Sequence, residues 1–278
     1  REVGLWIWET AGKTREGQRE LKRVICEMGG KNAMIVDSDA DLDEAIVDSI
    51  YSAFGFQGQK CSALSRLIVL EENYNRVIER LLGAAASVRV GNPEEPSVVV
   101  GPVIDEAAYR RILDYLEVGK SEATLAYQAK DVPPHGYFIP PTIFTGVTPD
   151  MRIAREEIFG PVLSVIKVRD LDEAIDVANG TDYALTGGFF SRSPANIERI
   201  KAQLEAGNVY INRPCTGAIV GRHPFGGFKM SGGGTKAGGE DYLLNFLIPR
   251  VVTENVARHG LAPEKTPEYR DEFLWPKK

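Results

Sequence analysis

The fold is decided by the stretch Val162-Leu163-Ser164-Val165-Ile166-Lys167-Val168 and the segment after it, Leu171-Asp172-Glu173-Ala174-Ile175-Asp176-Val177-Ala178. The first stretch is a nearly continuous apolar run rich in β-branched residues, which predicts a buried strand. The second has apolar residues at helical spacing. Downstream, a strand at 184–190, a helix at 194–205 and a strand at 208–212 are predicted. This alternation predicts an α/β fold with a mainly parallel sheet.

The same alternation extends upstream. An opening helix is predicted to end near Gly12, and a second helix begins after Asp41, with Glu44 as the carboxylate of a capping box, and ends at Gly55. Its predicted buried stripe is Leu42, Ala45, Ile46, Ile50 and Ala53. The remaining upstream elements are strands at 24–27, 33–36, 66–70 and 123–127 and helices at 74–85 and 106–117.

The last part of the chain has a different character. Pro214–Gly239 has little periodicity and many glycines, which predicts loops over the active face. Within it, Gly226–Gly234 fits neither glycine-rich phosphate-binding pattern and is interpreted as a loop. Leu244–Val256 predicts one long strand, and residues 257–278, rich in proline and charge, predict an extended tail.

The composition is typical of a soluble globular protein with an ample core: 278 residues, 43% hydrophobic and 26% charged, with a net charge of −6. Because the chain has no basic cluster, we expect no nucleic-acid partner. Because it has no apolar run of spanning length, we expect no membrane partner. The chain begins at Arg1 without a methionine, and a helix that begins there predicts a processed or truncated piece.

The cysteines and histidines indicate the redox compartment of the protein and whether it could bind a metal. The cysteines Cys26, Cys61 and Cys215 have no CxxC spacing, so reduced thiols in the cytoplasm, or in the mitochondrial matrix of a eukaryote, are expected. The three histidines lie far apart without ligand spacing, so no metal site is predicted.

Cys61 is the candidate nucleophile. A free cysteine is usually a small buried hydrophobic residue, and only roughly one in ten is reactive. The loop Phe56-Gln57-Gly58-Gln59-Lys60-Cys61-Ser62 is polar, flexible and cationic at Lys60, which favours an accessible thiolate. Cys26 lies in an apolar strand and is interpreted as structural, whereas Cys215, in a glycine-rich loop, has both interpretations open.

Glu27 is the candidate general base. It lies in Glu27-Met28-Gly29-Gly30-Lys31, directly after an apolar strand, and is predicted to project from a strand end, where α/β sites are built. A buried glutamate with a raised pKa can take a proton from water. Composition alone favours a solvated strand-end carboxylate over a base by about two to one.

Four motifs together closely resemble, in order and spacing, the signatures of the aldehyde dehydrogenase superfamily. They are Glu27-Met28-Gly29-Gly30-Lys31, Gly58-Gln59-Lys60-Cys61, Glu156-Glu157-Ile158-Phe159-Gly160-Pro161-Val162 and Pro224-Phe225-Gly226-Gly227. The resemblance extends to about Val256. Within the superfamily, the segments around Cys61 and Thr216-Gly217-Ala218-Ile219-Val220-Gly221 most resemble the branch that oxidises 1-pyrroline-5-carboxylate, the cyclic form of glutamate semialdehyde.

This resemblance implies a mechanism. Cys61 would attack the aldehyde to give a thiohemiacetal that passes a hydride to NAD, with its backbone N–H as half of an oxyanion hole. Glu27 would activate the water that hydrolyses the thioester and releases glutamate, a step of proline catabolism. The cofactor-binding residues would be Glu157, Phe159, Met28 and Gly4. The substrate-binding residues would be Ser62, Gly217, Ala218 and, as an apolar wall, Phe225.

The resemblance also implies a domain organisation. Residues 1–26 would be the end of a dinucleotide-binding domain, 27–243 the catalytic domain, and 244–256 a strand that pairs with another subunit of a homo-oligomer. The isolated chain would then have weak activity or none. Two alternatives stay open: a dehydrogenase for another small aldehyde, and a non-enzymatic fragment that folds and self-associates through its exposed strand.

Overall fold

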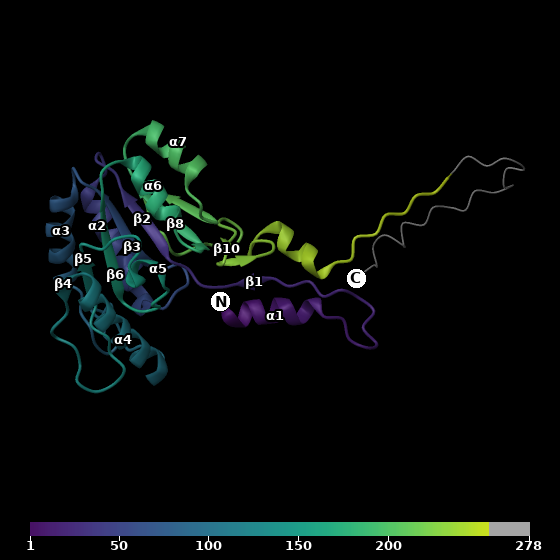
Figure 1. Ribbon diagram of the computed structural model, residues 1–278, viewed down its shortest axis with the longest axis horizontal. Coiled ribbons are helices and arrows are strands. Elements are labelled where there is room, and N and C mark those ends of the chain that lie inside the picture. The colour runs from purple at the N-terminus through teal and green to yellow at the C-terminus, as the bar shows by residue number, and fades with distance from the viewer. Residues whose placement is uncertain (256–278) are drawn as a thin grey trace, which may run out of the picture. The chain divides into compact units, whose positions relative to one another are not determined.

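The predicted α/β fold with a mainly parallel sheet is confirmed. The structure is a computed structural model that describes residues 1–255 (Figure 1). In these residues the main sheet has seven strands in the order β4-β5-β6-β3-β2-β8-β9. Its neighbouring strands are parallel except β4 and β5. The strands are β2 (Asn32–Val36), β3 (Leu64–Leu70), β4 (Thr124–Gln128), β5 (Thr142–Thr145), β6 (Val162–Val168), β8 (Thr186–Phe190) and β9 (Asn208–Ile211).

Helices cover both faces of this sheet. They are α2 (Leu42–Phe54), α3 (Tyr74–Ala86), α4 (Glu106–Glu122), α6 (Leu171–Asn179) and α7 (Pro194–Gln203). In β2, Ala33 and Ile35 join a buried cluster with residues of α4, α6 and α7, whereas Met34 and Val36 join a second cluster with residues of α2 and α3. Each fully buried aliphatic side chain stabilises the fold by about 1.5–3 kcal/mol. The sheet is therefore a rigid, two-sided platform.

The ends of α2 follow the predicted signals. The Asp41 carboxylate accepts hydrogen bonds from the N–H groups of Asp43 and Glu44, which satisfies donors that the first helical turn leaves free. At the other end, Gly55 opens the 3-10 turn η1 (Gly55–Gly58). Of the predicted stripe on α2, four residues are buried and Ile50 is half-buried. The nucleophile loop thus begins from a well-anchored helix.

Two short antiparallel ladders tie the glycine-rich loop region to the rest of the fold. Strand β1 (Cys26–Glu27) pairs with β11 (Gly232–Gly233), and β7 (Tyr183–Ala184) pairs with β10 (Phe228–Lys229). The strand predicted at 24–27 is therefore shorter, and the one predicted at 184–190 is divided into β7 and β8. The loop system is held by backbone pairing at both places.

The long strand predicted for Leu244–Val256 is wrong over its described part. Leu244 lies in the 3-10 helix η2 (Glu240–Phe246), and residues 247–255 form no strand. An apolar β-branched run becomes a strand only where a neighbouring strand pairs with its backbone. Within the described chain, residues 244–255 form no such ladder. Pairing with a second subunit stays a prediction. Val256 and the predicted tail at 257–278 lie outside the described residues.

The opening helix α1 (Glu2–Gly12) is confirmed, although its apolar stripe is exposed. The exposed fractions of Val3 and Trp6 are 68% and 64%, and no residue of α1 is buried. Sequence patterns did not predict β5 or the short helix α5 (Arg152–Arg155). Neither α1 nor any other helix in residues 1–255 combines the length and apolar character that crossing a membrane requires.

Candidate functional site

The candidate residues gather at the amino edge of the main sheet. Residues 28–31 lead into β2, Cys61 precedes β3, and Glu157 precedes β6. Glu27 does end a strand, as predicted, but that strand is β1, which pairs only with β11 outside the main sheet. The strand end that carries Glu27 therefore belongs to the β1–β11 ladder, and the other candidate residues lie at the amino edge of the main sheet. Residues 28–31, Cys61 and Glu157 all lie in segments that directly precede a parallel strand, and this is what brings them together.

The glycine pair allows two segments to touch. A Cβ atom at Gly29 would lie 2.1 Å from Glu157 Oε2, and one at Gly30 would lie 2.5 Å from the Cys61 carbonyl oxygen. The Gly30 N–H donates a hydrogen bond to Glu157 Oε1 at 2.9 Å. Since only glycine lacks the Cβ atom, this sequence is what lets the nucleophile loop and the Glu157 segment approach the start of β2.

The loop before Cys61 has a strained backbone. Phe56 and Gln57 have φ values of 56° and 59°, in the left-handed region that non-glycine residues rarely adopt. Gly58 follows with a φ of 65°, and a Cβ atom there would lie 2.3 Å from the Gly160 carbonyl oxygen. Such strain persists where surrounding contacts hold it, often at functional sites. Here it places Cys61 beside the segment that carries Glu157.

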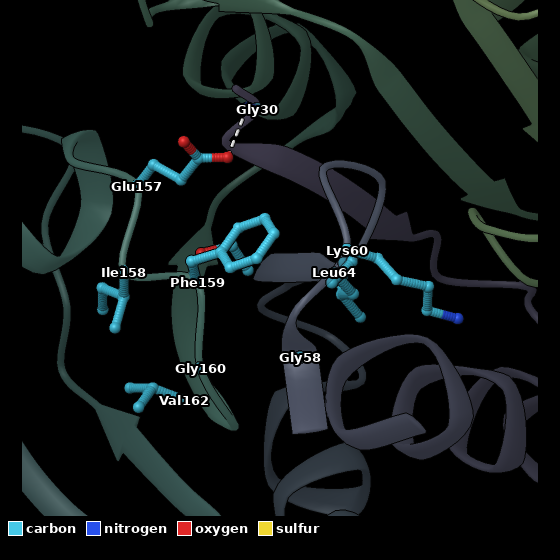
Figure 2. Close-up of a pocket in the computed structure, with 11 residues that line it drawn as sticks. Gly30, Gly58, Lys60, Leu64, Glu157, Ile158, Phe159, Gly160 and Val162 are labelled. Atoms are coloured by element: carbon cyan, nitrogen blue, oxygen red, sulfur yellow. Dashed lines mark hydrogen bonds between the residues drawn. The ribbon is translucent and has the colours of Figure 1, made fainter. Parts of the chain in front are cut away.

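The electrostatics around Cys61 combine burial with charges of both signs. Burial raises the pKa of the Cys61 thiol, and the negative charges of Glu27 and Glu157 raise it further. The Lys60 ammonium lies over the Tyr51 ring, 5.5 Å from the ring centroid. Burial lowers the pKa of Lys60, and the negative charges of the Cys215 and Cys61 thiolates oppose that shift. Figure 2 shows the Lys60 side chain pointing away from Glu157. Glu27 and Glu157 therefore lie near enough to Cys61 for their charges to act on its sulfur.

A pocket lies between the nucleophile loop and the Glu157 segment (Figure 2). Gly30, Gly58, Lys60, Glu157 and Phe159 are among its lining residues. The Glu157 carboxylate points toward Gly30, and the Phe159 ring lies between the two segments. Burial raises the pKa of Glu157, against the opposing effect of the Gly30 hydrogen bond. Phe159 has a φ of 58° and its side chain is partly exposed, so an apolar ring faces the pocket.

The structure brings Met28 and Gly4 together. A Cβ atom at Gly4 would lie 2.6 Å from Met28 Sδ, so the glycine permits close packing of α1 against this segment. The Cys26 thiol lies 3.7 Å from the Gly4 carbonyl oxygen, in keeping with its structural interpretation. Glu27 is exposed rather than buried, and its backbone pairs with Gly232. Its side chain is thus in contact with solvent water.

The predicted substrate-binding residues are joined at one point. Ser62 is buried, and its hydroxyl lies 2.7 Å from the Thr216 hydroxyl, directly before Gly217 and Ala218. Gly217 is exposed and has a φ of 81°. The hydrogen bond therefore links the residue after the nucleophile to the predicted anchor loop.

Two further predicted residues have defined surroundings. Cys215 is fully buried, its thiol donates weakly to the Ser62 carbonyl at 3.9 Å, and burial raises its pKa to about 12. This favours a structural thiol. Phe225 is half-buried and is held by two backbone hydrogen bonds with Ala237. The described residues contain no group of three or more His, Cys, Asp or Glu that could hold a metal ion.

Sequence reasoning missed three polar residues of this region. Asn32 donates from Nδ2 to the carbonyl oxygens of Cys61 and Ala63, both at 2.7 Å. Thr216 holds Ser62. Lys31 is fully buried, and burial, with Arg66 nearby, lowers its pKa to about 7. A polar pair at the start of the apolar run 33–36 was the available signal, because buried polar groups need specific partners.

Comparison with known proteins supports the resemblance seen in the motifs. The model of the aldehyde dehydrogenase family matches residues 1–252. A 1-pyrroline-5-carboxylate dehydrogenase of Anoxybacillus flavithermus is 49% identical over 254 residues, which are 91% of this chain and 49% of that protein. The 1-pyrroline-5-carboxylate dehydrogenase 2 of Bacillus subtilis is 50% identical over the same share of each chain. The chain thus spans about half the length of these curated relatives.

Solved structures agree. The proline utilization A protein of Bdellovibrio bacteriovorus, inactivated by N-propargylglycine, is 55% identical with a TM-score of 0.91, over 95% of this chain and 28% of that one. The 1-pyrroline-5-carboxylate dehydrogenase from Thermus with bound NAD is 51% identical with a TM-score of 0.85, over 88% of this chain and 47% of that one. The chain therefore belongs to the aldehyde dehydrogenase family.

Proposed function

We propose that this chain is the catalytic portion of an NAD-dependent dehydrogenase that oxidises L-glutamate 5-semialdehyde to glutamate in proline catabolism. The observation that most supports this is the position of Gly30. Its N–H holds Glu157, its Cα lies against the Cys61 carbonyl, and it follows Glu27 by three residues. One backbone position therefore joins the segments of the nucleophile, the base and the cofactor carboxylate. The names of the relatives support the choice of substrate.

In this proposal, the Cys61 sulfur forms a bond to the aldehyde carbon, and the N–H of Cys61 donates to the oxygen as it becomes negative. After the substrate carbon loses a hydride, the product is a thioester on Cys61. Glu27 then takes a proton from water, whose oxygen bonds to the thioester carbon as the carbon–sulfur bond breaks. The exposure of Glu27 to solvent supports its role with water.

The residues around Glu157 fit a dinucleotide. One carboxylate oxygen is engaged by the Gly30 N–H, and the group retains acceptor capacity for the hydroxyls of a ribose. The partly exposed Phe159 ring offers an apolar surface to the nicotinamide. Met28, which packs on Gly4, would line the cofactor cleft. When bound, NAD accepts the hydride that leaves the substrate carbon.

The anchor loop supplies selectivity for an amino acid semialdehyde. The amine and carboxylate of the substrate need fixed polar partners, which Ser62 and the backbone groups of Gly217 and Ala218 would provide. Because Thr216 already orients the Ser62 hydroxyl, the loop is coupled to the residue next to the nucleophile. Phe225 would pack on the aliphatic carbons.

Turnover tests the proposal in a protein that joins this chain to an upstream dinucleotide-binding portion. We expect NAD reduction with glutamate semialdehyde, followed by absorbance, and competitive inhibition by L-glutamate that exceeds inhibition by glutarate, which lacks the amine. Cys61→Ser should lower turnover by roughly 10³-fold or more, whereas Cys215→Ser should retain it. Equal inhibition by the two acids would contradict the anchor, and full turnover by Cys61→Ser would contradict the mechanism.

A further inference from the structure

Asn32 is a buried amide whose three hydrogen bonds join three segments of the site. Its exposed fraction is 3%. Nδ2 donates to the carbonyl oxygens of Cys61 and Ala63, and Oδ1 accepts from the Thr186 N–H at 3.0 Å. Both amide hydrogens and one oxygen lone pair are therefore used. Only this orientation of the amide satisfies its partners. After a rotation by 180°, the Asn32 oxygen would face two carbonyl oxygens, and its NH₂ group would face the Thr186 N–H, so that all three hydrogen bonds would be lost.

These bonds act on the peptide that follows the nucleophile. In a trans peptide the C=O and N–H groups point in opposite directions, and the described chain contains no cis bond. With the Cys61 carbonyl held toward Asn32, the Ser62 N–H is directed to the opposite side. Burial raises the pKa of the Cys61 thiol, and the backbone N–H groups of Ser62 and of Cys61 itself lower it. Gly30 closes the carbonyl side, since a Cβ atom there would lie 2.5 Å from the same oxygen.

We propose that Asn32 is a positioning residue for the nucleophile: it holds the Cys61–Ser62 peptide so that the Ser62 N–H faces the Cys61 sulfur. The inference rests on the proposed role of Cys61. Glu27 and Glu157 both oppose the negative thiolate, and the Lys60 ammonium lies over Tyr51. A correctly directed N–H group is thus a local contribution that favours ionisation of the sulfur.

The chain offers a matched control. Asn73 is also 3% exposed, and its Nδ2 donates to the carbonyl oxygens of Asp37 and Ser38 at 2.8 Å and 2.7 Å. These carbonyls follow the end of β2, whereas Asn32 begins β2. Asn32→Ser and Asn73→Ser therefore remove the same kind of bonds at opposite ends of one strand, and similar falls in the midpoint of urea unfolding are expected.

The test is the rate at which iodoacetamide alkylates Cys61 in the 278-residue chain, followed by peptide mass spectrometry across pH, with Cys26 as an internal reference. Asn32→Ser should move the Cys61 profile about one pH unit upward, which slows alkylation about tenfold at neutral pH. Asn73→Ser should leave the profile in place. An unchanged profile in Asn32→Ser, or an equal shift in Asn73→Ser, would overturn the proposal.

If Asn32→Ser does not fold, Asn32→Asp keeps the side-chain length and the acceptor for Thr186, and is expected to show at least the same shift. A wild-type profile in that variant would also overturn the proposal. Alkylation needs neither aldehyde nor NAD, so this result is independent of whether glutamate semialdehyde is the substrate.

Discussion

The two edges of the main sheet treat buried polar groups differently. At the carboxyl edge, the side chains around the turn that leaves β2 satisfy one another. Asp37, directly after β2, accepts a hydrogen bond from Asn196 at 2.7 Å, and Asp39 accepts one from the Ser191 hydroxyl at 2.8 Å. Asn73 donates to two backbone carbonyls beside them. These contacts fix the turns that leave the strands, as in any well-packed α/β protein.

At the amino edge, polar groups are held at a cost. Lys31 Nζ is buried without a hydrogen-bond partner in the described part of the chain, and burial raises the pKa values of Cys61 and Glu157. A folded chain tolerates such groups where they serve a reaction or a ligand. The contrast therefore distinguishes an edge that stabilises the fold from an edge that carries the chemistry.

Removing one carboxylate charge at each edge is expected to give the largest difference between the two edges, in turnover on one side and in stability on the other. Glu27→Gln should spare thioester formation and slow its hydrolysis by roughly 10²–10⁴-fold, because the amide cannot take a proton from water. Rapid mixing followed by mass measurement of the joined protein should detect an accumulating acyl-enzyme. Normal steady-state turnover in Glu27→Gln would remove the base from the mechanism.

Asp37→Asn is the matched change at the carboxyl edge. It weakens the acceptor for Asn196, so the free energy of unfolding should fall while turnover is retained. Loss of turnover comparable to that of Glu27→Gln would mean that the two edges are not functionally distinct.

The sequence predicted the main sheet and its helices well, because the apolar pattern of each strand and helix shows which of its faces are buried. A run such as Val162–Val168 is apolar on both faces only if helices cover both. The pattern failed where partners decide the structure. Strand β5 is four residues long and follows Pro140-Pro141, and its burial comes from β4 and β6 on either side. Leu244–Val256 has a strand-like composition, yet its described residues, 244–255, form no ladder with another strand.

The candidate site was predicted in part for the same reason. Cys61, Glu27 and Glu157 are recognisable from motifs, because each is flanked by glycines that permit close approach. The edge of the sheet at which they meet depends on topology, which local patterns do not encode. Asn32 and Thr216 act on residues 29 and 154 positions away in the sequence. Local patterns in a single sequence cannot predict contacts between residues so far apart along the chain.

A smaller effect is expected from adding one methyl group at the amino edge. A Cβ atom in Gly30→Ala would overlap the Cys61 carbonyl oxygen and the Asn32 amide, which should cost about 3 kcal/mol of stability and slow alkylation of Cys61. Gly83→Ala is the control, since Gly83 lies within α3 and a Cβ atom there meets nothing within 4 Å. It should stabilise the chain by about 0.5–1 kcal/mol. Urea unfolding of both variants measures the two changes in the free energy of unfolding. Equal destabilisation of Gly30→Ala and Gly83→Ala would contradict the prediction.

The smallest effect concerns the pH dependence of stability at Lys31. Burial lowers its pKa to about 7 in the folded chain, below the value of an unfolded lysine. Between these values the unfolded state binds the extra proton, so the free energy of unfolding rises with pH above about 7. At lower pH both states are protonated and the cost of the buried charge is fully present.

Lys31→Met removes the titrating group and should stabilise the chain below pH 7. The wild-type chain should gain about 1 kcal/mol relative to this variant between pH 7 and pH 8. Urea titrations at the two pH values measure the difference. At the carboxyl edge, the hydrogen bond from Arg192 lowers the pKa of Asp41. The stabilising effect of Asp41 is therefore lost only as pH falls through that lowered pKa. Asp41→Asn should accordingly leave the rise of the free energy of unfolding above pH 7 unchanged. Parallel curves for the wild type and Lys31→Met would mean that the lysine is not held uncompensated, and the electrostatic difference between the two edges would then rest on Cys61 and Glu157 alone.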